Sequence, residues 1–144
     1  MGKAELGQVP LFKIFFKDMN VKVDRKNRVA AVRAMEDCKE RLLAGESVVI
    51  FPEGSIPDAA PKMKKFKMGA FKLAIETGLP IIPVTYKSNY KRLSEGAWFK
   101  FCYPGRVDVV IHEPIDTSNK SEEDLVNLSN EVFEIISEPI KHLQ

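Results

Sequence analysis

The spacing of hydrophobic positions along the chain predicts alternating helices and strands. A helix is predicted over residues 29–42, where apolar residues recur every three or four positions. These residues are Val29, Val32, Met35, Cys38 and Leu42. Gly45 follows, at the position where a left-handed residue commonly ends a helix. Residues 47–51 come next and are rich in β-branched side chains, which is typical of a strand buried on both faces.

The second half of the chain continues this alternation. A helix is predicted over residues 68–76, closed by Gly78. A strand is predicted over residues 81–86, in which Pro83 marks an edge or a bend. A hairpin is predicted over residues 98–111, between two strand-like runs joined by a Pro-Gly pair.

Two shorter patterns lie toward the ends of the chain. Val21 and Val23 alternate with polar residues and predict a short strand. Ser121 and Asp124 have the spacing of a capping box, and apolar residues at helical spacing follow them. We expect this last helix to kink or end at Pro139.

The order of these elements predicts an α/β fold, with a mixed, mostly parallel β-sheet flanked by helices. The length of 144 residues fits a single domain over residues 1–144. In sheets of this kind, ligands bind beyond the carboxyl ends of the strands. The residues that follow Phe51, together with Arg25, are therefore expected at the functional site.

Composition narrows the class of protein. Hydrophobic residues make up 44% of the chain and charged residues 29%, which is typical of a globular protein, and the net charge of +2 indicates no partner by itself. Cys38 and Cys102 lack the spacing of a metal site and are expected to be reduced thiols. The sequence contains no apolar run long enough to span a bilayer and no recognisable signal peptide.

The region after residue 51 carries the candidate chemistry. Gly54 allows backbone amides to approach a ligand, and Glu53 could accept a hydrogen bond, pair with a cation or act as a base. Four lysines follow, and a helix begins near Gly69. The lysines are Lys62, Lys64, Lys65 and Lys67. Together these features predict an anion site, and the structural alternative is an ordinary turn followed by a solvated basic loop.

Arg25 is a second candidate, at the end of the short strand. Its guanidinium could hold a phosphate through two parallel hydrogen bonds. The alternative is a surface arginine paired with a carboxylate.

Four stretches of the chain, taken in order, resemble the motifs of the glycerophospholipid acyltransferase family, typified by 1-acyl-glycerol-3-phosphate acyltransferase. They are Lys3-x-Glu5-Leu6; Val21-x-Val23-Asp24-Arg25; Phe51-Pro52-Glu53-Gly54-Ser55 with Phe66-Lys67-Met68-Gly69-Ala70-Phe71; and Ile81-Ile82-Pro83-Val84. The resemblance extends from Lys3 to about residue 114.

The resemblance implies transfer of an acyl group from acyl-CoA or acyl-carrier protein to the free hydroxyl of a lysophospholipid, which converts 1-acyl-glycerol-3-phosphate to phosphatidic acid. It implies no metal and no cofactor beyond the acyl donor. The substrate-binding residues it implies are Lys3, Arg25, Phe51, Pro52, Glu53, Gly54, Ser55, Lys67 and Pro83. Lys3 and Arg25 would neutralise phosphate, Glu53 would hold glycerol oxygens or order the cations, and Pro83 would shape the floor of the site.

The chain departs from the family pattern at two points. The family's catalytic His-x-x-x-x-Asp motif lies upstream of the segment that matches Lys3, and neither His112 nor His142 has an aspartate five residues later. We therefore assign no catalytic residue in this chain, and expect a fragment that lacks the catalytic block and is inactive alone. The second departure is Ile56, which stands where the family usually has arginine. Lys62, Lys65 or Lys67 could supply the missing charge.

These inferences predict a protein on the cytoplasmic side of a membrane, either peripheral or anchored through an N-terminal segment missing from this chain. Its expected partners are a lysophospholipid, an acyl thioester and a membrane surface, with acyl-carrier protein as one candidate for the acyl donor. The main alternative is a non-catalytic domain that binds anions or lipids. A nucleic-acid partner is not expected, because the lysine loop lacks interleaved aromatic residues and the chain is not strongly basic.

Overall fold

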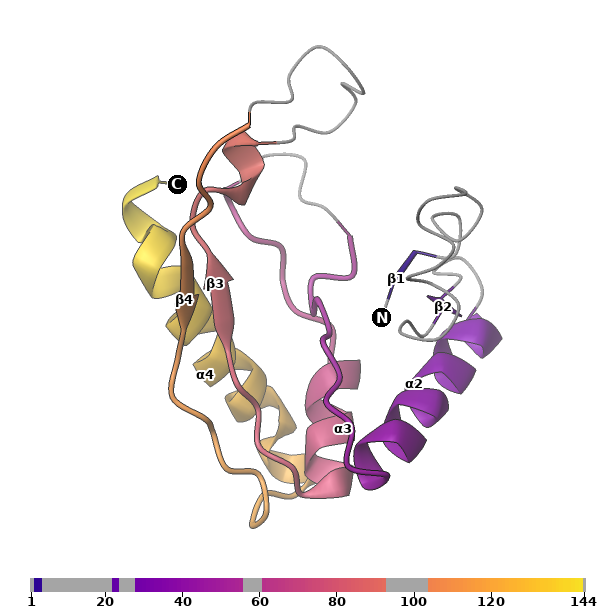
Figure 1. Cartoon of the computed structure of the whole chain (residues 1–144). Helices are drawn as coiled ribbons and strands as arrows, with labels where there is room; N and C mark the ends of the chain where they lie inside the picture. Colours follow the sequence, from indigo (N-terminus) through magenta and orange to yellow (C-terminus); the bar gives the residue numbers. More distant parts are fainter. Residues whose placement is uncertain (1, 4–21, 24–27, 56–60, 93–103, 144) are drawn as a thin grey trace. The chain divides into compact units, whose positions relative to one another are not determined.

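The computed structural model of the chain describes residues 2–3, 22–23, 28–55, 61–92 and 104–143 (Figure 1). The chain divides into two compact units, Met1–Phe51 and Pro52–Gln144. In the described residues, the first unit contains one long helix and a short strand pair. The second contains two packed helices and an antiparallel strand pair.

In the first unit, β1 (Gly2–Lys3) pairs in parallel with β2 (Lys22–Val23), so that Lys3 lies opposite Val23. The strand predicted near Val23 is thus confirmed over two residues. α2 (Arg28–Leu43) confirms the predicted helix. Gly45, just beyond it, has a φ of 86°, as expected for the left-handed residue that ends a helix.

The buried side of α2 differs from the predicted apolar stripe. Ala34 and Cys38 are buried, whereas Val29 and Val32 are exposed. The buried side of α2 is therefore formed by Ala34 and Cys38, two small residues four positions apart. Burial also raises the pKa of the Cys38 thiol, which favours its protonated, unreactive form.

The strand predicted over residues 47–51 is wrong for this structure. These residues have no regular secondary structure, and the side chains of Val49 and Phe51 are 66% and 58% exposed. A strand requires a neighbouring segment that pairs with its backbone N–H and C=O groups. Residues 47–51 belong to neither of the described strand pairs, β1-β2 and β3-β4, so β-branched composition alone did not fix regular strand structure here.

The core of the second unit lies between α3 (Gly69–Thr77) and α4 (Leu125–Ser137). Its buried members are Phe66, Phe71, Leu128 and Val132. The Phe66 ring stacks on Phe71, with centroids 6.1 Å apart, and meets Phe133 edge to face at 5.1 Å. The predicted helix over residues 68–76 is confirmed, and Gly78 ends it with a φ of 66°.

β3 (Val84–Tyr86) and β4 (Val109–Ile111) form an antiparallel pair in the second unit. α4 covers one face of this pair (Figure 1), and the Thr85 hydroxyl donates to the Ile136 carbonyl oxygen at 3.0 Å. β3 is shorter than the strand predicted over residues 81–86. Pro83 has no backbone N–H to donate, and the regular pairing begins after it.

The α/β class is confirmed, but a mostly parallel sheet is not. In the described residues the parallel pairing is limited to β1 and β2, and β3 pairs with β4 antiparallel. The predicted hairpin over residues 98–111 falls partly on residues 98–103, which lie outside the described residues. The described partner of β4 is β3, a pairing between segments far apart in sequence.

The end of the chain follows the sequence prediction closely. Ser121 and Asp124 form the predicted capping box at η3 (Glu122–Asp124), which leads directly into α4. The α-helix ends at Ser137, and the 3₁₀ segment η4 (Glu138–Leu143) contains Pro139. The expectation that Pro139 ends the helix is confirmed.

Candidate functional site: the turn at residues 52–55

The turn at residues 52–55 opens a loop whose two ends are joined by the backbone. The Lys67 amide donates to the Pro52 carbonyl oxygen at 2.8 Å. Phe66 lies next to Lys67 and is buried in the core. The core therefore anchors the return of the loop directly beside the turn.

Glu53 forms a second connection across this loop. One carboxylate oxygen, Oε2, accepts a hydrogen bond from the Lys64 backbone N–H at 2.7 Å. A hydrogen bond to an ionised acceptor is shorter and stronger than one between neutral groups. Glu53 therefore orders the lysine-bearing part of the loop against the turn.

Two lysine side chains lie at the turn itself. The Lys64 ammonium donates to the Ser55 hydroxyl at 3.3 Å. The Lys67 side chain crosses Gly54 so closely that a Cβ atom at residue 54 would lie 2.8 Å from Lys67 Cε and 3.1 Å from its Nζ. Gly54 also has a φ of 70°, which side-chain-bearing residues rarely adopt. The backbone conformation thus favours glycine at residue 54, and the absence of a side chain there leaves room for Lys67.

The predicted site residues are only partly brought together. The turn residues and Lys67 form one cluster. Lys3 lies in β1 of the other unit, and Arg25 lies outside the described residues. Pro83 is fully buried ahead of β3, where its carbonyl accepts from the His112 amide at 3.0 Å. No described polar contact joins it to the turn. The roles of Lys3, Arg25 and Pro83 at the site stay predictions.

Lys64 contacts the turn through Glu53 and Ser55, although the sequence prediction named Lys62, Lys65 or Lys67 as the replacement for the family arginine. Lys62 and Lys65, which the prediction favoured together with Lys67, are exposed. The basic composition of the loop pointed to this region. An irregular loop has no periodicity, however, so spacing could not show which lysine returns to the turn.

The two histidines lie in positions unlike a catalytic pair. His112 Nε2 lies 2.9 Å from the Thr85 hydroxyl oxygen. Because Thr85 donates its single proton to the Ile136 carbonyl, it accepts from the histidine N–H. This is the environment of a structural histidine. His142 is exposed in η4.

In the described parts of the chain, no group of three or more histidine, cysteine or carboxylate side chains is placed to hold a metal ion. The helices that the structure describes include none with the length and apolarity needed to cross a bilayer.

Comparison with known proteins identifies relatives with a common description. The 1-acyl-sn-glycerol-3-phosphate acyltransferase of Haemophilus influenzae is 30% identical over 145 residues, covering 99% of this chain and 58% of the relative. A mouse (Mus musculus) relative, 1-acyl-sn-glycerol-3-phosphate acyltransferase alpha, is 32% identical over 111 residues, covering 76% of this chain and 38% of the relative.

A solved acyltransferase structure also resembles this chain in its fold. The crystal structure of the 1-acyl-sn-glycerophosphate (LPA) acyltransferase PlsC from Thermotoga maritima matches 99% of this chain and 55% of that protein, with a TM-score of 0.79 and 31% identity. The chain spans 58% of the Haemophilus influenzae relative and 55% of the Thermotoga maritima protein. The family model described as Acyltransferase matches residues 1–87. The chain therefore belongs to the acyltransferase family.

Proposed function

We propose that this chain provides the acceptor-binding side of a lysophosphatidic acid acyltransferase. Such an enzyme transfers an acyl group from acyl-CoA or acyl-carrier protein to the free hydroxyl of 1-acyl-glycerol-3-phosphate and forms phosphatidic acid for phospholipid biosynthesis. The family membership and the names of the relatives support this reaction.

The observation that carries the proposal is the pair of lysines held at the turn. Glu53 fixes the Lys64 backbone at 2.7 Å, and Lys67 crosses Gly54. α3 begins just after Lys67 with no acidic residue in its first turn. Its N-terminal amides carry partial positive charge close in sequence to Lys67. This arrangement suits the phosphate of the acceptor, and we propose that it supplies the charge that the family usually provides through the arginine at the position of Ile56.

The reaction needs a base to remove the hydroxyl proton of the acceptor. We propose that this base is not among the described residues. The acceptor hydroxyl oxygen attacks the thioester carbonyl carbon, a C–O bond forms, the C–S bond breaks, and the thiol leaves as the hydroxyl proton is removed. The resemblance places the histidine that removes this proton upstream of the segment containing Lys3. We propose that the chain does not catalyse the reaction alone and that Lys3 and Arg25 contact the phosphate.

The proposal extends to the setting of the reaction. Both the acceptor and the product are lipids, so the enzyme would work at a membrane. We place it on the cytoplasmic side, where the acyl donor is available, either peripheral or anchored through another segment.

The test is acyl transfer by the protein expressed from the full reading frame of its gene. Lys67→Gln removes one cation from the turn, and we expect kcat/KM for lysophosphatidic acid to fall about 10- to 100-fold, mainly through KM, from the loss of one charge-assisted contact. Lys72→Gln is the matched control. It removes the same charge from an exposed residue of α3 that pairs with Glu122. Equal activity of the Lys67 variant and the control would refute the phosphate assignment.

The same experiment distinguishes the enzyme from the alternative, a non-catalytic lipid-binding protein. A full-length protein that binds lysophosphatidic acid but shows no acyl transfer would be a non-catalytic lipid-binding protein. A His-x-x-x-x-Asp motif in the reading frame upstream of Lys3 would favour the enzyme.

A further inference from the structure

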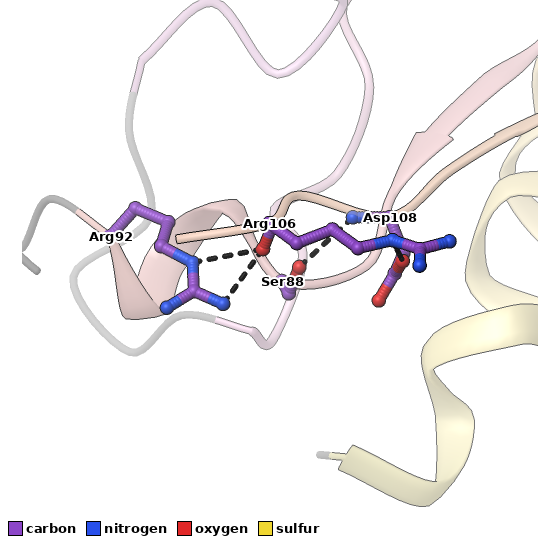
Figure 2. A network of polar contacts seen from close by, with 4 residues as sticks. All are labelled: Ser88, Arg92, Arg106 and Asp108. Carbon is purple, nitrogen blue, oxygen red and sulfur yellow. Dashed lines mark hydrogen bonds and ion pairs between the residues drawn. The ribbon is translucent and has the colours of Figure 1, made fainter. Parts of the chain in front are cut away.

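The chain segments that follow β3 and precede β4 are held together by a polar network (Figure 2). The Arg92 guanidinium donates twice to the Arg106 carbonyl oxygen, from Nε at 3.0 Å and from Nη2 at 2.7 Å. The Asp108 amide donates to the Ser88 hydroxyl at 3.1 Å. Ser88 and Arg92 thus connect the segment after β3 to the backbone of the segment before β4.

This connection is strongly basic. It carries four cations, which we call the basic neck: Lys87, Lys91, Arg92 and Arg106. Asp108 is the one carboxylate in residues 86–92 and 104–108, and it pairs with Arg106 Nε at 3.1 Å. The Arg106 side chain is nevertheless 89% exposed. No described carboxylate pairs with Lys87 or Lys91, so the neck presents a net positive surface.

An apolar face lies beside the basic neck. Tyr86 pairs with Val109 and Val84 pairs with Ile111, so these side chains share the face of the strand pair opposite Thr85, which contacts α4. Tyr86, Val109 and Ile111 are 46%, 45% and 73% exposed. Exposed aromatic and branched side chains bordered by lysine and arginine are typical of surfaces that lie at a lipid interface.

We propose that the basic neck and the adjoining residues Tyr86 and Val109 bind the surface of an anionic bilayer. Positive charge close to such a surface is attracted by it, and the exposed apolar side chains can enter the boundary between headgroups and acyl chains. The choice of a bilayer rests on the proposed function, because phosphatidic acid and its precursor are anionic lipids. This surface shares no residue with the turn at residues 52–55.

The test is partition of the full-length protein onto vesicles of phosphatidylcholine with and without phosphatidylglycerol. Phosphatidylglycerol supplies negative charge without being the substrate or product of the proposed reaction. We expect Lys87→Gln with Lys91→Gln to weaken binding to the anionic vesicles about 30-fold, from about fivefold for each cation lost. The loss should shrink as salt is raised.

Two controls make the result specific. Lys72→Gln with Lys120→Gln lowers the net charge equally, at residues paired with Glu122 and Glu131, and should change binding by less than about threefold. Lys67→Gln should keep vesicle binding while its kcat/KM for lysophosphatidic acid falls, so failure of either proposal can be told from failure of the other. Equal losses in the neck and control variants, no preference for anionic vesicles, or binding of the neck to an acidic protein but not to vesicles would overturn the proposal.

Discussion

Phe66 and Lys67 are neighbours in sequence but belong to two different regions of the second unit. Phe66 is buried against Phe71 and Phe133 in the core between α3 and α4. Lys67 is exposed, and crosses Gly54 at the turn. The peptide that joins them therefore links the part of the unit that supports its stability to the part that we propose binds phosphate.

The two regions are held by different interactions. The core depends on burial of apolar surface, which is non-directional and grows with the area removed from water. The turn depends on a few directed contacts, chiefly from the Lys64 and Lys67 amides to Glu53 and Pro52. A change in the core should therefore affect stability most, and a change in the turn should affect ligand binding most.

The largest effect on stability is expected in the core. Leu128 is fully buried, and Leu128→Ala should lower the free energy of unfolding by about 3 kcal/mol through lost burial and the cavity left behind. Val126→Ala on the same helix is the matched control, because Val126 is 57% exposed. Its effect should stay within about 0.5 kcal/mol. Urea unfolding of both variants measures the difference, and similar losses would show that α4 does not form the core described above.

A smaller effect is expected at the turn. Glu53→Ala removes the acceptor of the Lys64 amide, which should cost about 1 kcal/mol of unfolding free energy because water can partly replace it. Glu53→Gln keeps an acceptor oxygen and should recover part of the loss. Glu53→Ala should lose acyl transfer in the full-length protein, since the loop that positions the lysines is released, and Glu53→Gln should retain more of that activity. Glu113→Ala, at an exposed glutamate, is the control. A Glu53→Ala loss as large as that of Leu128→Ala would break the distinction between the two regions.

The smallest effect is the pH dependence of a polar contact far from the turn in sequence. The Ser121 backbone N–H and hydroxyl donate to the Asp124 carboxylate and hold its pKa below the usual 3.8. Because the folded pKa is the lower one, this stabilisation is present above pH 3.8 and is lost as pH falls through the folded pKa. The free energy of unfolding, measured from about pH 6 to about pH 2, should fall less steeply with acid in Asp124→Asn than in the unchanged protein. An unchanged slope would mean that the capping box contributes nothing to acid sensitivity.

Local features of the fold were predictable where the signal was local. The helix over residues 29–42, its closure at Gly45 and the capping box at Ser121 are each specified by residues within a turn or two of one another. The strand at residues 47–51 failed for the opposite reason. Strand formation depends on a pairing segment that can come from anywhere in the chain, and residues 47–51 are not part of either described strand pair.

The turn at residues 52–55 shows the same division at the candidate site. Its sequence, with the lysines that follow, was enough to indicate an anion site and, by resemblance, the acyltransferase family that the comparisons show. Only the folded chain selects Lys64 and Lys67 from the four lysines, because that choice depends on how the loop returns across Glu53 and Gly54. The sequence by itself determines the residue types and their short spacings. Contacts across the loop form only when backbone hydrogen bonding and core packing bring its two ends together.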